Sequence, residues 1–146
     1  MIEASAATAD LAALVAAAAS VRANAHAPYS RFKVGAAIRA EDGRIHVGAN
    51  VENAAYPQGL CAEAAAIGAM VAAGARRIRE IAVLAEGPDL CTPCGGCRQR
   101  IREFAAPDAM IHICGPEGVR RSVTLGELLP LAFGPKNLPD PKPPET

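Results

Sequence analysis

The chain has 146 residues, 51% of them apolar, which is the usual size of one domain and enough to bury a hydrophobic core without disulfides. Its 15 basic and 15 acidic side chains balance, so it has no strong positive field to attract nucleic acid, and the pairs Arg76-Arg77 and Arg120-Arg121 are expected to be solvated loop charges. No apolar run reaches the roughly 20 residues of a membrane span. We therefore expect neither a nucleic-acid nor a membrane partner.

The first half of the chain reads as a helix followed by a β-hairpin. Apolar side chains recur at helical spacing at Leu11, Leu14, Val15 and Ala18. They predict an amphipathic helix over residues 7–26, which Pro28 ends. Strands are predicted over 32–38 and 44–49, with a turn at Glu41-Asp42-Gly43 between them.

The second half alternates helices and strands after a loop over residues 50–60. The predicted elements are a helix over 62–73 stopped by Gly74, a strand over 78–84, a helix over 94–105, a strand over 110–114, and a short helix opened by a capping box at Thr124-Leu125-Gly126-Glu127. This order predicts an α/β fold, a sandwich with helices on both faces of the sheet, over residues 1–134. Residues 135–146 are rich in proline and are expected to form an extended or disordered tail.

The alanine-rich start of the chain is predicted to be an ordinary helix and not a signal peptide. No basic segment precedes it, and Asp10 interrupts it. Without an export signal, the five cysteines are expected in the reducing cytoplasm, where disulfides are rare. Cysteines clustered in such a compartment indicate metal or redox chemistry.

Three of the cysteines fall at predicted helix beginnings. Cys61 precedes one helix, and Cys94 and Cys97 open the next, where two thiols one turn apart can reach a single ion. Helix N-termini carry partial positive charge, which favours the thiolate that a metal needs. Three protein ligands leave one tetrahedral position for water. The pattern therefore predicts a catalytic site with one Zn²⁺ per chain.

A carboxylate follows the first of these cysteines. Glu63 lies among alanines in an apolar helix, where a buried charge is costly unless it has a role. Beside water held by a metal, it could move protons to and from a substrate. Zinc deaminases combine such a glutamate with a later Pro-Cys-x-x-Cys. The matching stretches here are Cys61-Ala62-Glu63 and Pro93-Cys94-Gly95-Gly96-Cys97, so Glu63 is predicted to be catalytic.

Spacing alone leaves other uses of these residues open. Cys94 and Cys97 also have the spacing of a redox dithiol. If Cys91 joined the three ligands, the site would be a closed structural zinc. Cys114 lies in an apolar strand and is expected to be a core residue. The histidines lack metal-ligand spacing and are expected to be ordinary helix-end or strand residues: His26, His46 and His112.

From residue 27 to about residue 138, the chain resembles the small homotetrameric cytidine deaminases. Five stretches carry the resemblance, in the family's order and spacing: 28–37, 50–56, 61–63, 93–99 and 128–133. The resemblance implies a three-layer α/β/α sandwich with a mixed sheet and a homotetramer with shared active sites. It also implies hydrolysis of cytidine and deoxycytidine to uridine and deoxyuridine, with release of ammonia, in pyrimidine salvage.

The resemblance further implies which residues contact the substrate. Asn50 and Glu52 correspond to residues that hydrogen-bond the ribose. Phe32 corresponds to an aromatic residue beside the nucleoside, and Phe133 to one that reaches the base from a neighbouring subunit. Tyr56 corresponds to a residue that helps to build the intersubunit site.

The pyrimidine edge and the metal shell complete this picture. The backbone of Ala62 and the carbonyl of Thr92 correspond to groups that read the base. Many members have arginine directly after Cys-Ala-Glu, where this chain has Ala64. Three thiolates around one zinc leave a negative site, so helix dipoles and Arg98 are expected to offset more of that charge here.

Two alternative functions stay open from the sequence. The first is a sister deaminase of another aminated heterocycle, such as blasticidin S, for which the same chemistry would serve. The second is a zinc-stabilised module without enzymatic activity. An editor of cytosine in polynucleotides is disfavoured, because the neutral chain offers no track for a nucleic-acid backbone.

Overall fold

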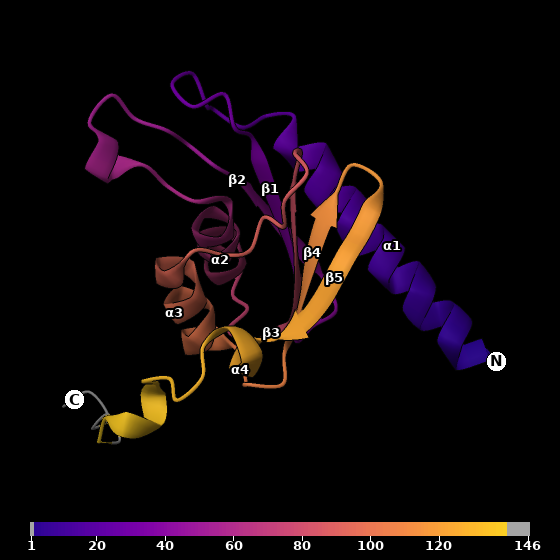
Figure 1. Cartoon of the computed structure of the whole chain (residues 1–146). Coiled ribbons are helices and arrows are strands. Elements are labelled where there is room, and N and C mark those ends of the chain that lie inside the picture. Colours follow the sequence, from indigo (N-terminus) through magenta and orange to yellow (C-terminus); the bar gives the residue numbers. More distant parts are fainter. Residues whose placement is uncertain (1, 140–146) are drawn as a thin grey trace.

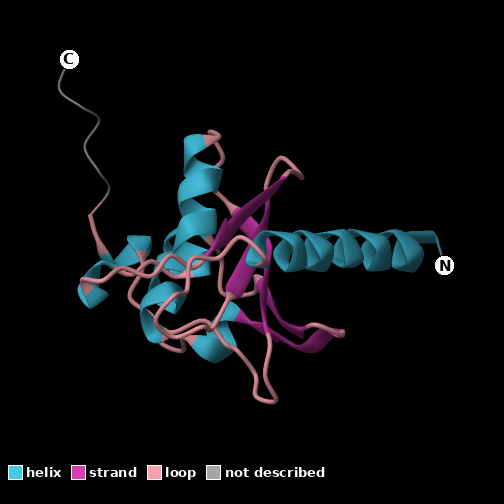
Figure 2. Cartoon of the chain, turned by 90° about the horizontal axis from the view of Figure 1, so that it is seen from above, coloured by secondary structure: helices cyan, strands magenta, loops and turns pink. Residues whose placement is uncertain are grey.

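The computed structural model describes residues 2–139, which form a five-stranded sheet with helices on both faces (Figures 1 and 2). The strands are β1 (Val34–Ala40), β2 (Ile45–Ala49), β3 (Ile78–Ala85), β4 (Met110–Gly115) and β5 (Gly118–Thr124). The α-helices are α1 (Ile2–Arg22), α2 (Ala62–Ala72), α3 (Gly95–Phe104) and α4 (Leu125–Leu128), and short 3-10 turns cover Tyr56–Gln58 and Pro135–Asn137.

The sheet is mixed, as the resemblance implied. Its strand order is β2-β1-β3-β4-β5. The β1–β2, β1–β3 and β4–β5 pairs are antiparallel, whereas β3 and β4 are parallel. Helix α3 lies in the connection between the two parallel strands, since such strands need a crossover longer than a hairpin turn.

Two hydrophobic clusters confirm the predicted three-layer α/β/α architecture. On one face, Leu14 and Ala18 of α1 pack against the sheet residues Ala37, Ala82 and Leu84. On the other face, α2, α3 and α4 bury a larger cluster that includes Met70, Ile101, Leu125, Ile81 and Ile111. The layer of α2 and α3 carries the cysteines that the sequence singled out.

Two glycines bring helices close to the sheet. A Cβ atom on Gly48 of β2 would lie 2.2 Å from the backbone nitrogen of Ala66 and 2.5 Å from the carbonyl oxygen of Ala62. On the opposite face, a Cβ on Gly35 would lie 2.1 Å from the carbonyl oxygen of Ala18. Only glycine permits these contacts. Gly48 therefore allows the first turns of α2 to rest directly on β2.

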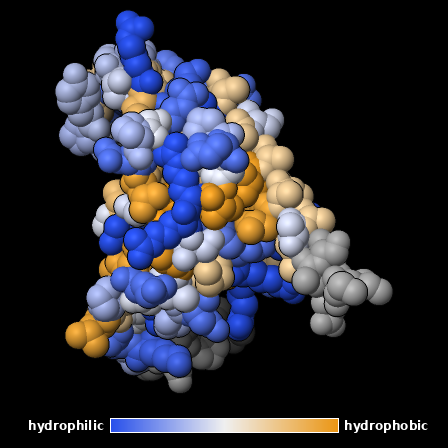
Figure 3. Space-filling view, turned by 45° about the vertical axis from the view of Figure 1, so that its right-hand side comes forward, coloured by the Kyte–Doolittle hydropathy of each residue, from blue (hydrophilic) through white to orange (hydrophobic). Residues whose placement is uncertain are grey.

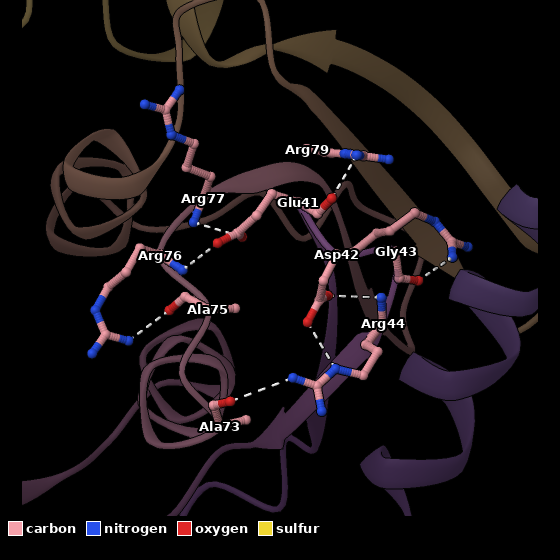
Figure 4. Close-up of polar contacts among 10 residues, drawn as sticks. Glu41, Asp42, Gly43, Arg44, Ala73, Ala75, Arg76, Arg77 and Arg79 are labelled. Carbon is pink, nitrogen blue, oxygen red and sulfur yellow. Dashed lines mark hydrogen bonds and ion pairs between the residues drawn. The ribbon is translucent and has the colours of Figure 1, made fainter.

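The turn between β1 and β2 is tied to the loop before β3 (Figure 4). The carboxylate of Glu41 accepts hydrogen bonds from the backbone N–H groups of Arg76 and Arg77, both at 2.9 Å. The guanidinium of Arg79 donates to the Glu41 carbonyl. The two backbone bonds lower the pKa of Glu41. These contacts join the hairpin end to the segment that follows α2.

Most predicted boundaries agree with the structure within two residues, but both ends of α1 differ. The helix begins at Ile2, not at residue 7. It ends at Arg22, not at residue 26, because the N–H of His26 donates to the carbonyl of Asn50, at 3.0 Å. This bond turns the chain toward the segment that follows β2. The capping box of α4 is confirmed, since Thr124 and Glu127 exchange side-chain bonds to each other's backbone N–H.

The strand β5 was not predicted, and it corrects the expectation for Arg120-Arg121. Both arginines lie on this strand and not in a loop. Arg120 forms an ion pair with Glu117 and donates to the carbonyl of Gly87. The Arg120 guanidinium is therefore bound by other groups of the chain and is not a free solvated charge.

The N-terminal helix borders a groove on the protein surface. Helix α1 extends past the sheet (Figure 1). Its apolar Leu11 and Val15 line a shallow groove beside the β4–β5 turn. Figure 3 shows hydrophobic atoms next to strongly hydrophilic ones on the face turned forward in that view. Within the described residues, no helix combines the length and the apolarity needed to cross a membrane.

In the predicted tail, residues 135–137 form a turn, and residues 140–146 lie outside the described part of the chain.

Candidate metal centre and active site

Three sulfur atoms converge at the N-terminal ends of α2 and α3. Cys61 is the N-cap residue of α2, Cys94 is the N-cap residue of α3, and Cys97 lies in the first turn of α3. Their Sγ atoms all lie within 4.8 Å of one another. The cysteines predicted as metal ligands are thus brought together by two helix N-termini.

Burial and backbone contacts act in opposite directions on these thiols. Burial raises the pKa of Cys61 and of Cys97, whereas a hydrogen bond from the backbone of Cys97 lowers the pKa of Cys94. The sequence predicted that helix N-termini lower the pKa of these thiols. The pKa is lowered at Cys94, whereas burial raises it at Cys61 and Cys97. A thiophilic cation would replace these protons, since it binds the thiolate form. Three soft donors in this arrangement fit Zn²⁺.

Cys91 does not complete a four-thiolate shell. In the part of the chain that the structure describes, the compact sulfur group contains only the three predicted ligands. Cys91 is half-buried and lines the neighbouring cavity, and burial raises its pKa. Three sulfur donors would hold a metal ion and would leave one tetrahedral position for water or substrate.

Glu63 is buried beside the sulfur group. It is the second residue of α2, and only 5% of its surface is exposed. Burial raises its pKa, and a hydrogen bond from the Cys97 thiol acts in the opposite direction. A carboxyl group with a raised pKa is suited to accept and return a proton near neutral pH.

A cavity of about 460 Å³ opens next to Glu63, Cys61 and Cys94. The substrate-binding residues predicted from the resemblance that line it are Phe32, Asn50, Glu52, Ala62 and Thr92. Four other wall residues had no predicted contact with the substrate, and the fold brings them in from separate segments: Val34, Val51, Leu60 and Cys91.

A second hollow of about 400 Å³ lies beside the cavity and shares Ser30, Glu52 and Gly59 with its walls. Glu52 lines both spaces, and Tyr29 and Tyr56 line the outer one. The two tyrosine rings pack edge to face, with their centroids 5.9 Å apart. Of the Tyr56 surface, 76% is exposed. Tyr56 therefore lies at the rim and not at the metal end of the cavity.

Phe133 does not line the cavity of its own chain. It lies in the segment after α4, where 58% of its surface is exposed. The side-chain amide of Gln99 on α3 donates to the Phe133 carbonyl at 3.0 Å. The next residue, Gly134, lies so close to the guanidinium of Arg102 that a Cβ atom would come within 2.9 Å of it. The outer side of α3 thus holds this segment in place.

Arg98 supports the chain that leads into Cys94. Its Nε donates to the carbonyl of Pro93 at 2.8 Å, one Nη donates to the carbonyl of Leu128 at 2.9 Å, and the other donates to the Thr92 hydroxyl at 3.3 Å. These bonds hold Thr92 at the cavity. They also place a positive charge one residue after Cys97.

Comparisons with known proteins agree with this geometry. Residues 9–113 match the sequence model of the cytidine and deoxycytidylate deaminase zinc-binding region. A cytidine deaminase of Sporosarcina psychrophila is 40% identical over 129 residues, which is 88% of this chain and 95% of the relative. A cytidine deaminase of Mycobacterium tuberculosis is 43% identical over 117 residues, which is 80% of this chain and 84% of the relative. The crystal structure of cytidine deaminase from Burkholderia pseudomallei superposes with a TM-score of 0.79 at 43% identity, covering 83% of this chain and 97% of that chain.

Proposed function

The chain belongs to the family of cytidine and deoxycytidylate deaminases with a zinc-binding region, and we propose that it hydrolyses cytidine and deoxycytidine to uridine and deoxyuridine, with release of ammonia, in pyrimidine salvage. One observation carries the proposal. The buried Glu63 and the sulfurs of Cys61 and Cys94 border the same cavity as the polar side chains of Asn50 and Glu52.

Cys61, Cys94 and Cys97 would hold one zinc ion. When bound, it supplies a Lewis acid that lets water lose a proton near neutral pH. The absence of a charge at Ala64 supports a larger part for Arg98 and for the ends of α2 and α3 in balancing three thiolates.

Glu63 moves the protons of the reaction. It accepts a proton from the attacking water as the oxygen bonds to C4 of the pyrimidine, and it passes that proton to N3. It then takes the proton of the new hydroxyl group and delivers it to the amino group, so that the C4–N bond breaks and ammonia leaves. One water molecule is consumed, and Glu63 ends in its starting state.

The cavity walls provide the contacts to the nucleoside. Asn50 and Glu52 bind the ribose hydroxyls, whose ability to donate and accept matches an amide and a carboxylate. Phe32 packs against the nucleoside. The backbone of Ala62 and the carbonyl of Thr92 bind the pyrimidine edge. Support for these roles comes from their shared position in one cavity with Glu63.

The working form is a homotetramer in a reducing cytoplasm. Exposed apolar side chains in the segment after α4 support an assembly that covers them: Leu131, Phe133 and Leu138. In that assembly, Phe133 reaches the base in a neighbouring subunit, and Tyr56 borders the shared site. The free thiols of the metal centre support a reducing compartment.

The test is a substrate panel with the purified full chain at one zinc per chain. The ultraviolet change on deamination is followed with cytidine, deoxycytidine, cytosine and blasticidin S. Turnover of the two nucleosides is expected, with little turnover of cytosine, which lacks the ribose. Turnover of blasticidin S without turnover of cytidine would assign the chain to the sister activity. Inactivity on all four at full zinc occupancy would indicate a structural module.

A further inference from the structure

The side chain of Asn50 is bonded to the backbone that carries Phe32. Its Oδ1 accepts the N–H of Val34 at 2.9 Å, and its Nδ2 donates to the carbonyl of Phe32 at 2.8 Å. The backbone N–H of Asn50 also donates to the carbonyl of Val34, at 3.2 Å. Asn50 is thus hydrogen-bonded to the backbone on both sides of Lys33. One of these bonds is to Phe32, whose side chain lines the cavity.

Glu52 holds the same segment at its other end. One carboxylate oxygen, Oε1, accepts the N–H groups of Tyr29 and Ser30 at 2.9 and 3.1 Å. The backbone N–H of Glu52 donates to the carbonyl of His26 at 2.8 Å. The Ser30 side chain adds a further hydrogen bond to this carboxylate. A carboxylate offers about four acceptor sites, so Glu52 keeps capacity to accept a hydrogen bond from a ligand.

Between these anchors, two local hydrogen bonds hold the segment: the N–H of Arg31 donates to the carbonyl of Ala27 and the N–H of Phe32 donates to the Ser30 hydroxyl, both at 3.0 Å. Residues 28–32 are all exposed, so they contribute no core packing. Arg31 has a φ of 59°, in the left-handed region that a residue with a side chain adopts at a cost. Such a conformation persists only where the surroundings fix it. The bonds from Glu52 before Arg31 and from Asn50 after it add to the local bonds and attach this segment to the chain that follows β2.

We propose that Asn50 and Glu52 are positioning residues for Phe32, in addition to their contacts with the ribose. The inference rests on the proposed function. It links sugar recognition to base packing, because the residues that bind the sugar also fix the loop that presents the aromatic ring. Losing either side chain therefore weakens binding even of a nucleoside that has no ring hydroxyl to offer.

The test separates the two roles by removing the ribose contact from the substrate. kcat and KM are measured for cytidine and for 2′,3′-dideoxycytidine with the wild type, with Asn50→Ala, and with Asn24→Ala as an exposed control at the end of α1. With dideoxycytidine, we expect Asn50→Ala to lower kcat/KM by about tenfold, mainly through KM, since lost hydrogen bonds of this kind cost about that factor. Equal kcat/KM values for Asn50→Ala and the wild type on dideoxycytidine would overturn the proposal.

Two further comparisons distinguish positioning from a general loss of structure. The double variant Asn50→Ala/Phe32→Ala is expected to be no worse on dideoxycytidine than Phe32→Ala alone, because Asn50 acts through Phe32. Additive losses would contradict this. Glu52→Gln keeps an acceptor oxygen for the two N–H groups, so it is expected to retain kcat/KM on dideoxycytidine, whereas Glu52→Ala loses it. Equal losses in both variants count against the positioning role.

Zinc content and melting temperature are measured for every variant. If Asn50→Ala fails to fold, the Glu52 pair decides the question. If the wild type does not turn over cytidine, the proposed function itself fails. If the wild type is active and the variants match it on dideoxycytidine, only the positioning role fails.

Discussion

The Sγ atoms of Cys61 and Cys94 lie 3.9 Å apart, although 33 positions separate the two residues in the chain. Each cysteine is the N-cap residue of its helix. The positive ends of two helix dipoles therefore meet at one point, and they favour negatively charged ligands there.

Replacing Cys97 by serine is expected to reduce bound zinc well below one per chain and to abolish turnover, because the buried thiol is one of three donors. Zinc is measured by atomic absorption on dialysed protein. Chelation should lower the melting temperature of the wild type but not that of Cys97→Ser. Cys91→Ser is the matched control, since Cys91 lies outside the sulfur group, and it is expected to keep its zinc.

Glu63→Gln is expected to retain zinc and to lose turnover by a factor of at least about 10³, because the amide is nearly isosteric but cannot accept the proton. Bound zinc and kcat are measured on the same preparation. A variant that keeps wild-type kcat would remove Glu63 from the proton transfers. A variant that loses zinc would show instead that the carboxylate supports the metal centre.

Gly48→Ala is expected to destabilise the fold by about 1–3 kcal/mol, because the added methyl group would overlap the backbone of α2. Since α2 begins beside Cys61 and carries Glu63, turnover should fall as well. Gly68→Ala, on α2 itself, is the matched control. Gly68 is exposed, with nothing within 4 Å of an added Cβ, so this change is expected to stabilise the protein by up to about 1 kcal/mol. Equal effects at the two glycines would contradict the close packing of α2 on β2.

Glu41→Gln is expected to lower the melting temperature at neutral pH, because it removes the charge that two backbone N–H groups stabilise. These bonds hold the pKa of Glu41 below its ordinary value of 4.5. The stabilisation is therefore complete above pH 4.5 and is lost as the pH falls through the lowered pKa. The difference in melting temperature from the wild type should be constant near neutrality and shrink in acid. Glu103→Gln, at an exposed position of α3, serves as the control and should leave the melting temperature at neutral pH unchanged.

Phe133 can be tested for action in a neighbouring subunit by mixing two impaired chains. Glu63→Gln supplies an intact Phe133, and Phe133→Ala supplies an intact Glu63. Co-expression should give more activity than the sum of the two variants alone, because some mixed sites contain both residues. Activity that only equals the sum would place any role of Phe133 within its own chain. Gln99→Ala should resemble a weaker Phe133→Ala, since Gln99 binds the Phe133 carbonyl.

The sequence predicted those parts of the fold that local rules control. The capping box at Thr124, the glycine stop after α2 and the cysteines at helix starts each depend on neighbours within a few positions. β5 escaped prediction because it is an edge strand. Within it, Val123 is the one buried side chain, and Arg120 and Arg121 break the alternating pattern that marks a strand.

The cavity shows the same division between local and tertiary information. Glu63 and the cysteines stand out by residue type, so their chemistry could be predicted from spacing. The cavity walls are different, because Val51, Leu60 and Cys91 become neighbours only after distant segments fold together. The bonds from Asn50 to the backbone around Lys33 are likewise invisible in the sequence, since both partners are main-chain groups.

Helix α3 has ten residues and takes part in two separate features of the molecule. Its inner side contributes Cys97 to the metal centre, and its outer side, through Gln99, fixes the segment that carries Phe133. A rigid helix cannot shift at one of these points without shifting at the other. Substitutions along α3 can thus disturb both metal retention and the position of Phe133. Loss of activity in an α3 variant identifies neither cause until zinc content and oligomeric state have been measured on the same sample.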